Sequence, residues 1–265
     1  MSVGLFALHG FLGSPEALQP AIALCTTPWA RCVVPTLPGH GPRGVAERES
    51  FESLVESYAK TLHGHDISWV ISGYSMGARL ALAVALRMLR EPTPRPLALV
   101  LNGVDPGIQD PAAREARQQW EHRMSDALPT LGIDAFVARL WESIPIFESQ
   151  RSLSPVHQEA LRARRSQHAP AGVAWAMTTL GTGAMPAMSP EFASLAHTPV
   201  WLVTGALDSK FTALSHTMTQ QILHATHTVV PRRGHDLWTE APRVIATHLD
   251  LAARALESAR SGATA

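Results

Sequence analysis

The chain has 265 residues, 46% of them hydrophobic, and its 22 basic residues balance its 22 acidic ones. This length suits one α/β domain with an inserted subdomain, and the hydrophobic fraction is ample for a large core. Because the charges cancel, no overall field favours nucleic acid or a membrane as a partner, so a preference for charged ligands must come from local clusters. The sequence has no apolar run long enough to span a bilayer and no signal-peptide pattern after Met1. We therefore expect a cytoplasmic protein.

Short apolar runs alternate with helical patterns along most of the chain. The apolar runs are continuous rather than alternating, which indicates an α/β fold with a mostly parallel central sheet, covered by helices on both faces. Strands are predicted near residues 4–8, 32–35, 69–72, 97–101, 199–205 and 227–231, and helices near residues 15–25, 50–63, 76–90 and 244–259.

The middle segment, residues 110–187, has a different character. It is rich in Arg, Gln, Glu and Ala, spaces residues such as Trp120 and Phe136 as a helix would, and contains no strand-like run. We predict a helical cap inserted over the C-terminal edge of the sheet. The chain then divides into a first part of the core at residues 1–109, the cap at 110–187 and a second part of the core at 188–265. We expect a monomer or a small homo-oligomer.

Cysteine and histidine often bind metals, but two close pairs of these residues in the chain do not form a metal-ligand pattern. Cys25 and Cys32 have no metal-ligand spacing and belong to no larger set of cysteines, so we expect free thiols. His63 and His65 have no third ligand nearby and are interpreted as part of a solvated loop. The sequence therefore predicts no metal site.

The segment Gly39–Gly44 matches the pattern G-x-G-x-x-G of dinucleotide-binding loops. Such a loop must run directly into a helix whose N-terminus meets the pyrophosphate. Here Pro42 interrupts the segment and polar residues follow. We therefore predict a turn at this point and no cofactor.

A G-x-S-x-G sequence, Gly73-Tyr-Ser-Met-Gly77, lies between a predicted strand and a predicted helix. In that context the serine sits at the apex of a sharp turn and is raised above the sheet, while the flanking glycines leave room for the strained turn. The motif alone is common, but its position between strand and helix predicts a nucleophile elbow at Ser75.

Three loops at the same edge of the predicted sheet supply a catalytic triad. Every strand of a parallel sheet ends at one edge, so Ser75, Asp208 and His235 converge although they are far apart in the chain. Their order of serine, acid and histidine is the one expected of α/β-hydrolase folds. His235 can take the proton of the weakly nucleophilic hydroxyl, and Asp208 can fix the imidazole tautomer and stabilise the imidazolium.

Two other carboxylates compete with Asp208 for the acid position. Asp105 also follows a strand end, and Asp236 is adjacent to the histidine but points in another direction along the backbone. We rank Asp208 ahead of both. The N–H groups of Met76, directly after the serine, and of Phe11, in the Gly-rich loop after the first strand, are the expected oxyanion donors.

Further motifs, which cover most of the chain including the cap, carry a resemblance to a known family. They are His9–Ser14, Leu37–Gly41, Gly73–Arg79, Pro106–Gln109 followed by Arg114 and Arg117, Arg165–Ser166, Asp208–Phe211 and Pro231–His235. The chain resembles the synthases of menaquinone biosynthesis that form 2-succinyl-6-hydroxy-2,4-cyclohexadiene-1-carboxylate. The first two segments are general to α/β-hydrolase relatives and the others are specific. The sequence departs from the family pattern at Thr36, where Asp is common, and at Ala78, where a second Gly is common.

The resemblance implies an elimination rather than a hydrolysis. In the family, a proton is abstracted from a cyclohexene ring that carries succinyl, enolpyruvyl and carboxylate groups, and pyruvate leaves. On this interpretation Ser75, activated by His235 and Asp208, is the base, and the oxyanion hole holds charge that develops on the succinyl carbonyl. No acyl-enzyme and no cofactor are needed, and the partner is a small anionic tricarboxylate.

Basic residues near the triad independently favour an anionic ligand. Arg79 lies one helical turn after Ser75, and Lys210 follows Asp208 in a loop at the same edge. Charge-assisted hydrogen bonds suit a substrate with three carboxylates. The residues that the resemblance places around the substrate are Tyr74, Arg79, Arg117, Trp141, Arg165 and Lys210.

Two other classes of function remain open. A serine hydrolase, such as an esterase or a carbon–carbon bond hydrolase acting on a small carboxylated substrate, would use the same triad by nucleophilic attack. A binding module that has kept only the fold is disfavoured, because no member of the triad is missing from the sequence.

Overall fold

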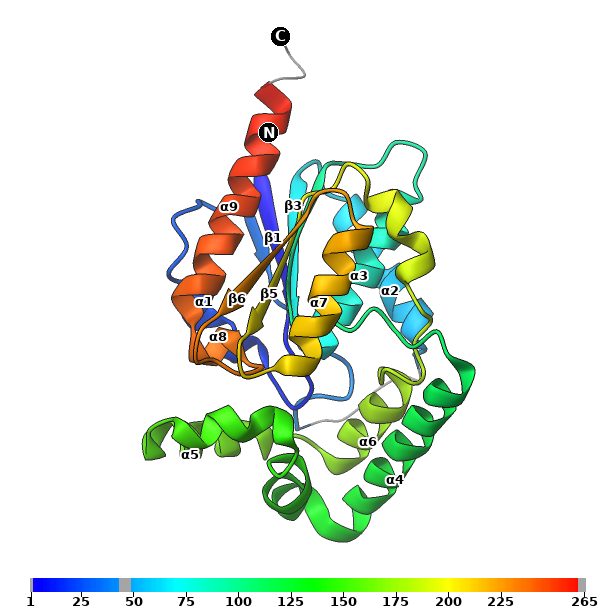
Figure 1. Cartoon of the computed structure of the whole chain (residues 1–265), viewed down its shortest axis with the longest axis vertical. Coiled ribbons are helices and arrows are strands. Elements are labelled where there is room, and N and C mark those ends of the chain that lie inside the picture. Colours follow the sequence, from blue (N-terminus) through cyan, green and yellow to red (C-terminus); the bar gives the residue numbers. More distant parts are fainter. Residues whose placement is uncertain (1, 43–48, 262–265) are drawn as a thin grey trace.

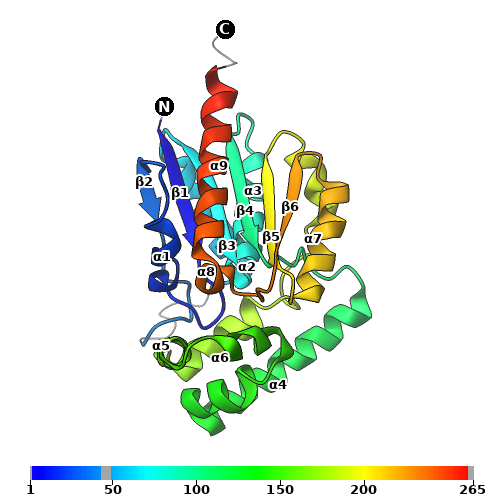
Figure 2. The same cartoon turned by 60° about the vertical axis from the view of Figure 1, so that its left-hand side comes forward.

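The core of the fold is a six-stranded sheet, seen in a computed structural model that describes residues 2–42 and 49–261. Its strands follow the order β2-β1-β3-β4-β5-β6, and each pair of neighbours is parallel (Figures 1 and 2). The predicted α/β fold with a parallel sheet is confirmed. The strands are β1 (Val3–Leu8), β2 (Arg31–Val33), β3 (Ser68–Tyr74), β4 (Leu97–Asn102), β5 (Val200–Gly205) and β6 (Ala225–Val230).

Helices cover both faces of this sheet (Figure 2). One face carries α1 (Gln19–Ile22), α8 (Leu237–Glu240) and the long α9 (Pro242–Ser261), and the other carries α2 (Phe51–His63), α3 (Met76–Leu89) and α7 (Ser209–Gln221). The helix α3 packs directly on β3, and α2 packs on α3. Helix α3 is apolar on nearly all sides because it is enclosed between the sheet and its neighbours.

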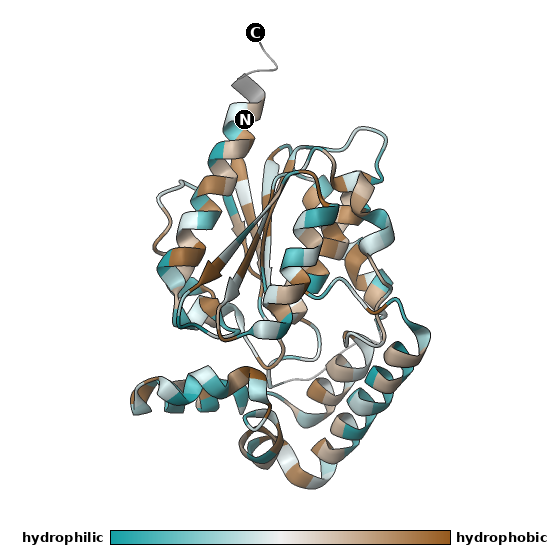
Figure 3. Cartoon of the chain, in the orientation of Figure 1, coloured by the Kyte–Doolittle hydropathy of each residue, from teal (hydrophilic) through white to brown (hydrophobic). Residues whose placement is uncertain are grey.

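The continuous apolar runs follow from this double cover. Successive side chains of a strand point to opposite faces, so both sets must be hydrophobic when both faces are buried. In β1, Leu5 and Ala7 join the core beneath α9, whereas Phe6 and Leu8 join the core beneath α3. Figure 3 shows that hydrophobic residues dominate the central strands.

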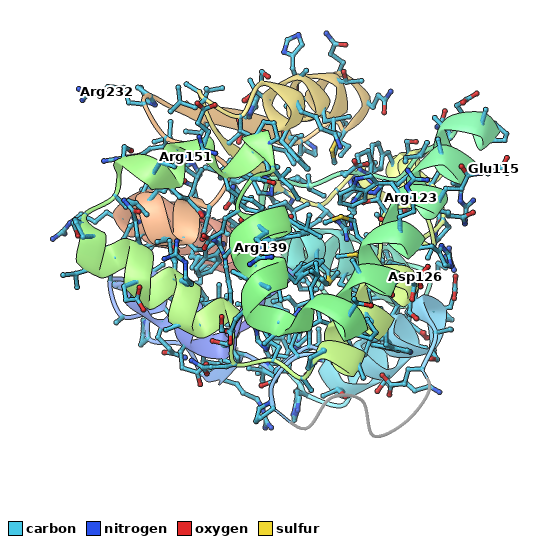
Figure 4. The ribbon with its side chains drawn as sticks, turned by 90° about the horizontal axis from the view of Figure 1, so that it is seen from below. Glu115, Arg123, Asp126, Arg139, Arg151 and Arg232 are labelled. Atoms are coloured by element: carbon cyan, nitrogen blue, oxygen red, sulfur yellow. The ribbon has the colours of Figure 1, made fainter. Side chains whose placement is uncertain are left out.

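The segment between β4 and β5 is helical and lies against the C-terminal edge of the sheet (Figure 1). Charged side chains such as Glu115, Arg123 and Asp126 lie on its outer side (Figure 4). The division of the chain at residues 110 and 187 remains a prediction. The segment contains α4 (Pro111–Phe136), the π-helical turn η2 (Val137–Trp141), the 3-10 helix η3 (Pro145–Ser152), α5 (Pro155–Arg165), α6 (Pro170–Thr179) and the 3-10 helix η4 (Ser189–Leu195).

The long helix α4 is broken near its end. Pro129 interrupts its hydrogen bonds, and Gly132 has φ 73° and ψ 164°, a conformation that is not helical. The π-turn η2 follows and ends at Trp141, next to Phe136 in the small core of this region. Irregular turns of this kind often mark functional positions, and here η2 directs an indole toward the sheet edge.

The first predicted helix, residues 15–25, is shorter than the sequence pattern indicates. The structure has a 3-10 turn, η1 (Pro15–Ala17), followed by the four residues of α1. Pro20 lies at the start of α1. Proline has no N–H to donate and its ring clashes with the carbonyl four residues earlier, so one continuous helix from Pro15 cannot form.

Several local predictions can also be compared with the structure. Gly39 and Gly41 have positive φ in a turn, and α2 begins only at Phe51, whereas the end of the G-x-G-x-x-G match, residues 43–44, lies outside the described residues. The free thiols expected at Cys25 and Cys32 are confirmed. No helix within residues 2–42 and 49–261 is both long and apolar enough to cross a membrane.

Candidate active site

Ser75 occupies a strained turn between β3 and α3. Its backbone has φ 52° and ψ −108°, a region that non-glycine residues rarely adopt and that costs about 1–3 kcal/mol. The turn is held from the neighbouring strand, since the Ser75 N–H donates to the carbonyl of Asn102 at 2.9 Å. Gly77 lets α3 approach β1: a Cβ there would lie 2.1 Å from the carbonyl oxygen of Leu8. The sequence motif thus forms the raised turn that it predicts.

His235 and Asp208 form a buried pair beside this turn. His235 Nδ1 donates to Asp208 Oδ2 at 2.6 Å, and the two residues are 2% and 5% exposed. The pairing fixes the imidazole so that Nε2 is left to exchange protons. Gly103 makes room for the ring, because a Cβ there would lie 2.5 Å from His235 Cε1.

The two rival carboxylates are occupied elsewhere. Asp105 Oδ1 accepts from the Gly107 N–H at 3.0 Å, and its Oδ2 lies 3.3 Å from Lys210 Nζ. Asp236 caps α8 by accepting from the backbone and hydroxyl of Thr239. Of the three candidates, only Asp208 is hydrogen-bonded to His235 within the described part of the chain.

Ser75 and His235 both line one cavity of about 220 Å³. Ser75 Oγ has no hydrogen-bond partner among the described residues, so the structure does not record a bond from Ser75 to His235. Such contacts are often long in ligand-free sites and tighten in the complex. Both side chains therefore lie at the same cavity, but the hydrogen bond between Ser75 and His235 that would complete the triad is not formed among the described residues.

The expected oxyanion donors also lie at this cavity. Met76 is the first residue of α3, and Phe11 lies in the loop after β1. Neither backbone N–H donates to another residue in the described ranges. Met76 lies at a helix N-terminus, where unpaired N–H groups lie in the positive field of the helix dipole. Such a position suits a developing oxyanion.

Arg79 is buried in the wall of the cavity. Only 6% of the residue is exposed, its Nη2 donates to the Leu180 carbonyl at 2.9 Å, and its Nε has no partner among the described residues. Burial lowers the pKa of Arg79 to about 10, so the guanidinium stays charged at neutral pH. An unpaired buried donor of this kind requires an acceptor, and a carboxylate would provide one.

Two further cations line the same cavity. Lys210 lies over the ring of Phe211 at 4.9 Å and is largely exposed. Arg117 binds Glu121, with 2.7 Å between its Nε and Oε1, and its guanidinium lies 4.5 Å from the ring of Trp120. The sequence-based reasoning selected both cations but missed Glu121.

The aromatic residues expected around the substrate are also present at the cavity. Tyr74 lies 5.1 Å from the His235 ring, and burial raises the pKa of its phenol well above the usual value. Trp141 packs on Phe11 with ring centroids 4.7 Å apart, and its buried Nε1 has no partner among the described residues. Apolar and neutral residues that sequence reasoning had not assigned to the site complete the wall: Trp120, Ile144, Ile146, Phe147, Met177, Gly181, Thr182 and Phe211.

Arg165 is the one predicted substrate residue that the structure does not bring to this cavity. Its guanidinium donates to Glu142 at 3.2 Å and to Gln150 at 2.6 Å. It also lies 5.0 Å from the ring of Phe147, and Phe147 itself lines the cavity. The cation is therefore neutralised next to the site rather than exposed within it.

Two polar residues outside any recognisable motif bind the backbone of the loop that carries His235. Glu240 is 8% exposed and accepts from the Gly234 N–H at 2.8 Å and from Ser149 Oγ at 2.9 Å. Burial raises the pKa of Glu240. Asn102, at the end of β4, binds the backbone of His235. Across the described ranges, no group of three His, Cys, Asp or Glu residues is placed to hold a metal ion.

Comparisons with known proteins agree with this geometry. Residues 5–248 match the Alpha/beta hydrolase family. A protein of Bacillus subtilis (strain 168) assigned as a 2-succinyl-6-hydroxy-2,4-cyclohexadiene-1-carboxylate synthase is 30% identical over 249 residues, which cover 92% of this chain and 87% of that protein. The synthase of the same name from Serratia proteamaculans (strain 568) is 29% identical, with 92% and 91% covered. The solved structure of MenH from S. aureus is similar with a TM-score of 0.87 and 27% identity, covering 97% of this chain and 94% of that chain.

Proposed function

The chain belongs to the family of 2-succinyl-6-hydroxy-2,4-cyclohexadiene-1-carboxylate synthases within the alpha/beta hydrolase family, and we propose that it catalyses the pyruvate-eliminating step of menaquinone biosynthesis. Its substrate would be 2-succinyl-5-enolpyruvyl-6-hydroxy-3-cyclohexene-1-carboxylate. The observation that carries the proposal is the cavity beside Ser75 and His235, whose wall holds the cations Arg79, Arg117 and Lys210. A site for neutral esters would gain nothing from three cations.

In the proposed reaction the triad removes a proton from the substrate ring. His235 takes the proton of Ser75 Oγ, and the resulting alkoxide abstracts the ring proton. The electron pair of the broken C–H bond at C2 forms a C2–C3 double bond, the ring double bond shifts from C3–C4 to C4–C5, and the C–O bond at C5 to the enolpyruvyl group breaks. The leaving group departs as enolpyruvate and becomes pyruvate. Asp208 supports the charge on His235 throughout.

The oxyanion donors stabilise the charge that the abstraction creates. Proton removal next to a carbonyl drives electron density onto its oxygen. Phe11 and Met76 line the cavity where the succinyl carbonyl would lie, and their N–H groups would donate to that oxygen. Loss of one such donor typically slows catalysis about 10²- to 10³-fold.

The three carboxylates of the substrate would bind the cations of the cavity. Arg79 Nε, which has no partner among the described residues, the guanidinium of Arg117 and the ammonium of Lys210 can each form charge-assisted hydrogen bonds. Tyr74 and Trp141 would contact the ring. Arg165 is not among the proposed direct contacts, because it does not line this cavity.

The decisive experiment supplies the enolpyruvyl substrate and follows pyruvate release with lactate dehydrogenase and NADH. Wild-type protein should release pyruvate well above the spontaneous rate, and Ser75→Ala should return the rate close to it. No release above the spontaneous rate would refute the assignment. A panel of neutral esters tests the alternative of a serine hydrolase, which would be favoured if their turnover exceeded that of the cyclohexene.

A further inference from the structure

A carboxylate is built into the wall of this cation-lined cavity. The side chain of Glu121, on α4, is 2% exposed, and Glu121 is the only acidic residue that lines the cavity within the described part of the chain. A buried carboxylate is costly unless it is paired and hydrogen-bonded, and it also repels an anionic substrate. Its presence at an anion site therefore requires an explanation.

The surrounding backbone is shaped to hold this carboxylate in one position. The N–H of Gly183 donates to Glu121 Oε2 at 3.2 Å. A Cβ at Gly181 would lie 2.4 Å from the same oxygen, and one at Gly183 would lie 2.9 Å from it. Because neither position has room for a side chain, the loop that follows α6 encloses the carboxylate closely. Glu121 is thus fixed in place before any ligand binds.

The fixed carboxylate in turn holds Arg117. Glu121 Oε1 accepts from Arg117 Nε at 2.7 Å, and the guanidinium lies against the ring of Trp120 at 4.5 Å from Cζ to the ring centroid. The side chain of Arg117 is 34% exposed, so without these contacts it could sample many rotamers. With its Nε and one face occupied, the plane of the guanidinium is set.

This leaves the outer edge of the guanidinium available. Arg117 Nη1 and Nη2 have no hydrogen-bond partner in residues 2–42 and 49–261. Two parallel N–H groups in a fixed plane match the two oxygens of a carboxylate, and arginine forms such bidentate pairs where lysine cannot. The carboxylate of Glu121 thus occupies the Nε side of Arg117 rather than its Nη1–Nη2 edge.

We propose that Glu121 is a positioning residue that fixes Arg117 so that its Nη1–Nη2 edge binds one carboxylate of the substrate. This inference deepens the proposed function and rests on it. Glu121 acts on binding through Arg117 and does not touch the reacting atoms. Changing it should therefore alter KM far more than kcat.

The main test compares Glu121→Gln with Glu115→Gln. Glu115 is an exposed glutamate of the same helix, on the outer side of the molecule (Figure 4). Glu121→Gln should raise KM for the elimination about 10-fold and keep kcat within about 3-fold, which corresponds to the loss of one charge-assisted contact. Glu115→Gln should leave both constants unchanged. An unchanged KM in Glu121→Gln would overturn the inference, as would a fall in kcat alone.

Arg117 variants separate positioning from a general effect on folding. Arg117→Lys keeps the charge but loses Nε and the bidentate edge, so it should raise KM to the same degree as Glu121→Gln. In an Arg117→Ala background, Glu121→Gln should change KM by no more than about 2-fold, because Glu121 affects binding only through Arg117. Independent, additive effects would overturn the inference. Because Arg117 is partly exposed, Arg117→Lys should still fold and can be measured even if Glu121→Gln fails to fold.

A binding measurement keeps this inference distinct from the elimination activity. Succinate carries the carboxylate groups without the ring, and calorimetric titration can measure its binding without turnover. Wild-type protein should bind succinate, and Glu121→Gln should bind it about 10-fold more weakly. Equal binding by the two proteins, or no binding by the wild type, would overturn the inference even if pyruvate is released. Weaker binding by the variant with no pyruvate release would instead overturn the proposed reaction alone.

Discussion

The side chain of Asn102 holds the backbone of His235 against the end of β4. Its Nδ2 donates to the His235 carbonyl at 3.2 Å, and its Oδ1 accepts from the Leu237 N–H at 3.2 Å. The backbone carbonyl of Asn102 accepts from the Ser75 N–H on its other side. One buried residue therefore ties the turn of the serine to the loop of the histidine.

We predict that Asn102→Ala impairs both stability and turnover. The change leaves the buried N–H of Leu237 and the carbonyl of His235 without this partner, which should lower the free energy of unfolding by about 1–3 kcal/mol. A displacement of His235 of about 1 Å can lower kcat about 10²-fold. Urea unfolding and the pyruvate assay measure the two effects. A stability loss with unchanged kcat would show that other contacts hold the histidine loop.

We predict that Asp208→Asn lowers kcat by about 10³- to 10⁴-fold, as loss of the acid does in other triads, because the amide favours the wrong tautomer of His235. Asp105→Asn should lower it far less, since Asp105 pairs with Lys210 rather than with the histidine. Single-turnover kinetics with both variants distinguish the two acids. A larger loss in Asp105→Asn would reverse the assignment.

The positions of Ser75, Asp208 and His235 at the sheet edge could be predicted because each follows a strand end. In a parallel sheet, topology alone brings such loops to one edge. Beyond this topology, the hydrogen bond between Asp208 and His235 requires only the local geometry of their two loops. The G-x-S-x-G motif likewise describes a backbone turn, and the structure contains that turn.

The part of the cavity wall that the helical segment forms could not be predicted in the same way. Arg165 was expected at the substrate, but its charge is engaged by Glu142 and Gln150, which are 23 and 15 residues away in the chain. Glu121 looks like an ordinary i,i+4 partner of Arg117 on an exposed helix. Its burial arises only when the loop after α6 packs against α4, a tertiary contact that leaves no local pattern.

We predict that Arg79→Met weakens substrate binding without destabilising the fold. Arg79 is a buried cation whose Nε has no partner among the described residues, and an apolar side chain of similar size removes that unfavourable burial. KM should rise about 10- to 100-fold, while the free energy of unfolding stays the same or increases. Substrate kinetics and urea unfolding test the two halves separately.

Arg87→Met is the matched control on the same helix. Arg87 forms ion pairs with Glu56 and Glu91 in a partly exposed position. Its loss should change stability by no more than about 1 kcal/mol and leave KM unaltered. A substantial loss of stability in Arg79→Met with no change in KM would identify Arg79 as a structural cation instead.

Three buried histidines join the loop of the oxyanion donor Phe11 to its neighbours. His9 accepts from the Leu37 N–H at 3.0 Å, His40 accepts from the Leu12 N–H at 3.1 Å, and His168 accepts from the Gly41 N–H at 2.8 Å. The rings of His9 and His40 lie 4.9 Å apart, and those of His40 and His168 lie 5.3 Å apart. Burial lowers the pKa of His9 to about 4 and also lowers the pKa of His40 and His168.

We predict that stability falls as the pH drops from about 6.5 toward about 4, because the unfolded chain binds more protons at these histidines than the folded chain does in that range. The full contribution is present above the unfolded pKa, and the shift of His9 alone corresponds to about 3 kcal/mol lost by about pH 4. Urea unfolding across this range measures the slope. His168→Asn keeps an acceptor for the Gly41 N–H but no longer titrates, so it should flatten the slope, whereas the exposed His216→Gln should not. Equal slopes in wild type and His168→Asn would exclude His168 as a source of the acid sensitivity.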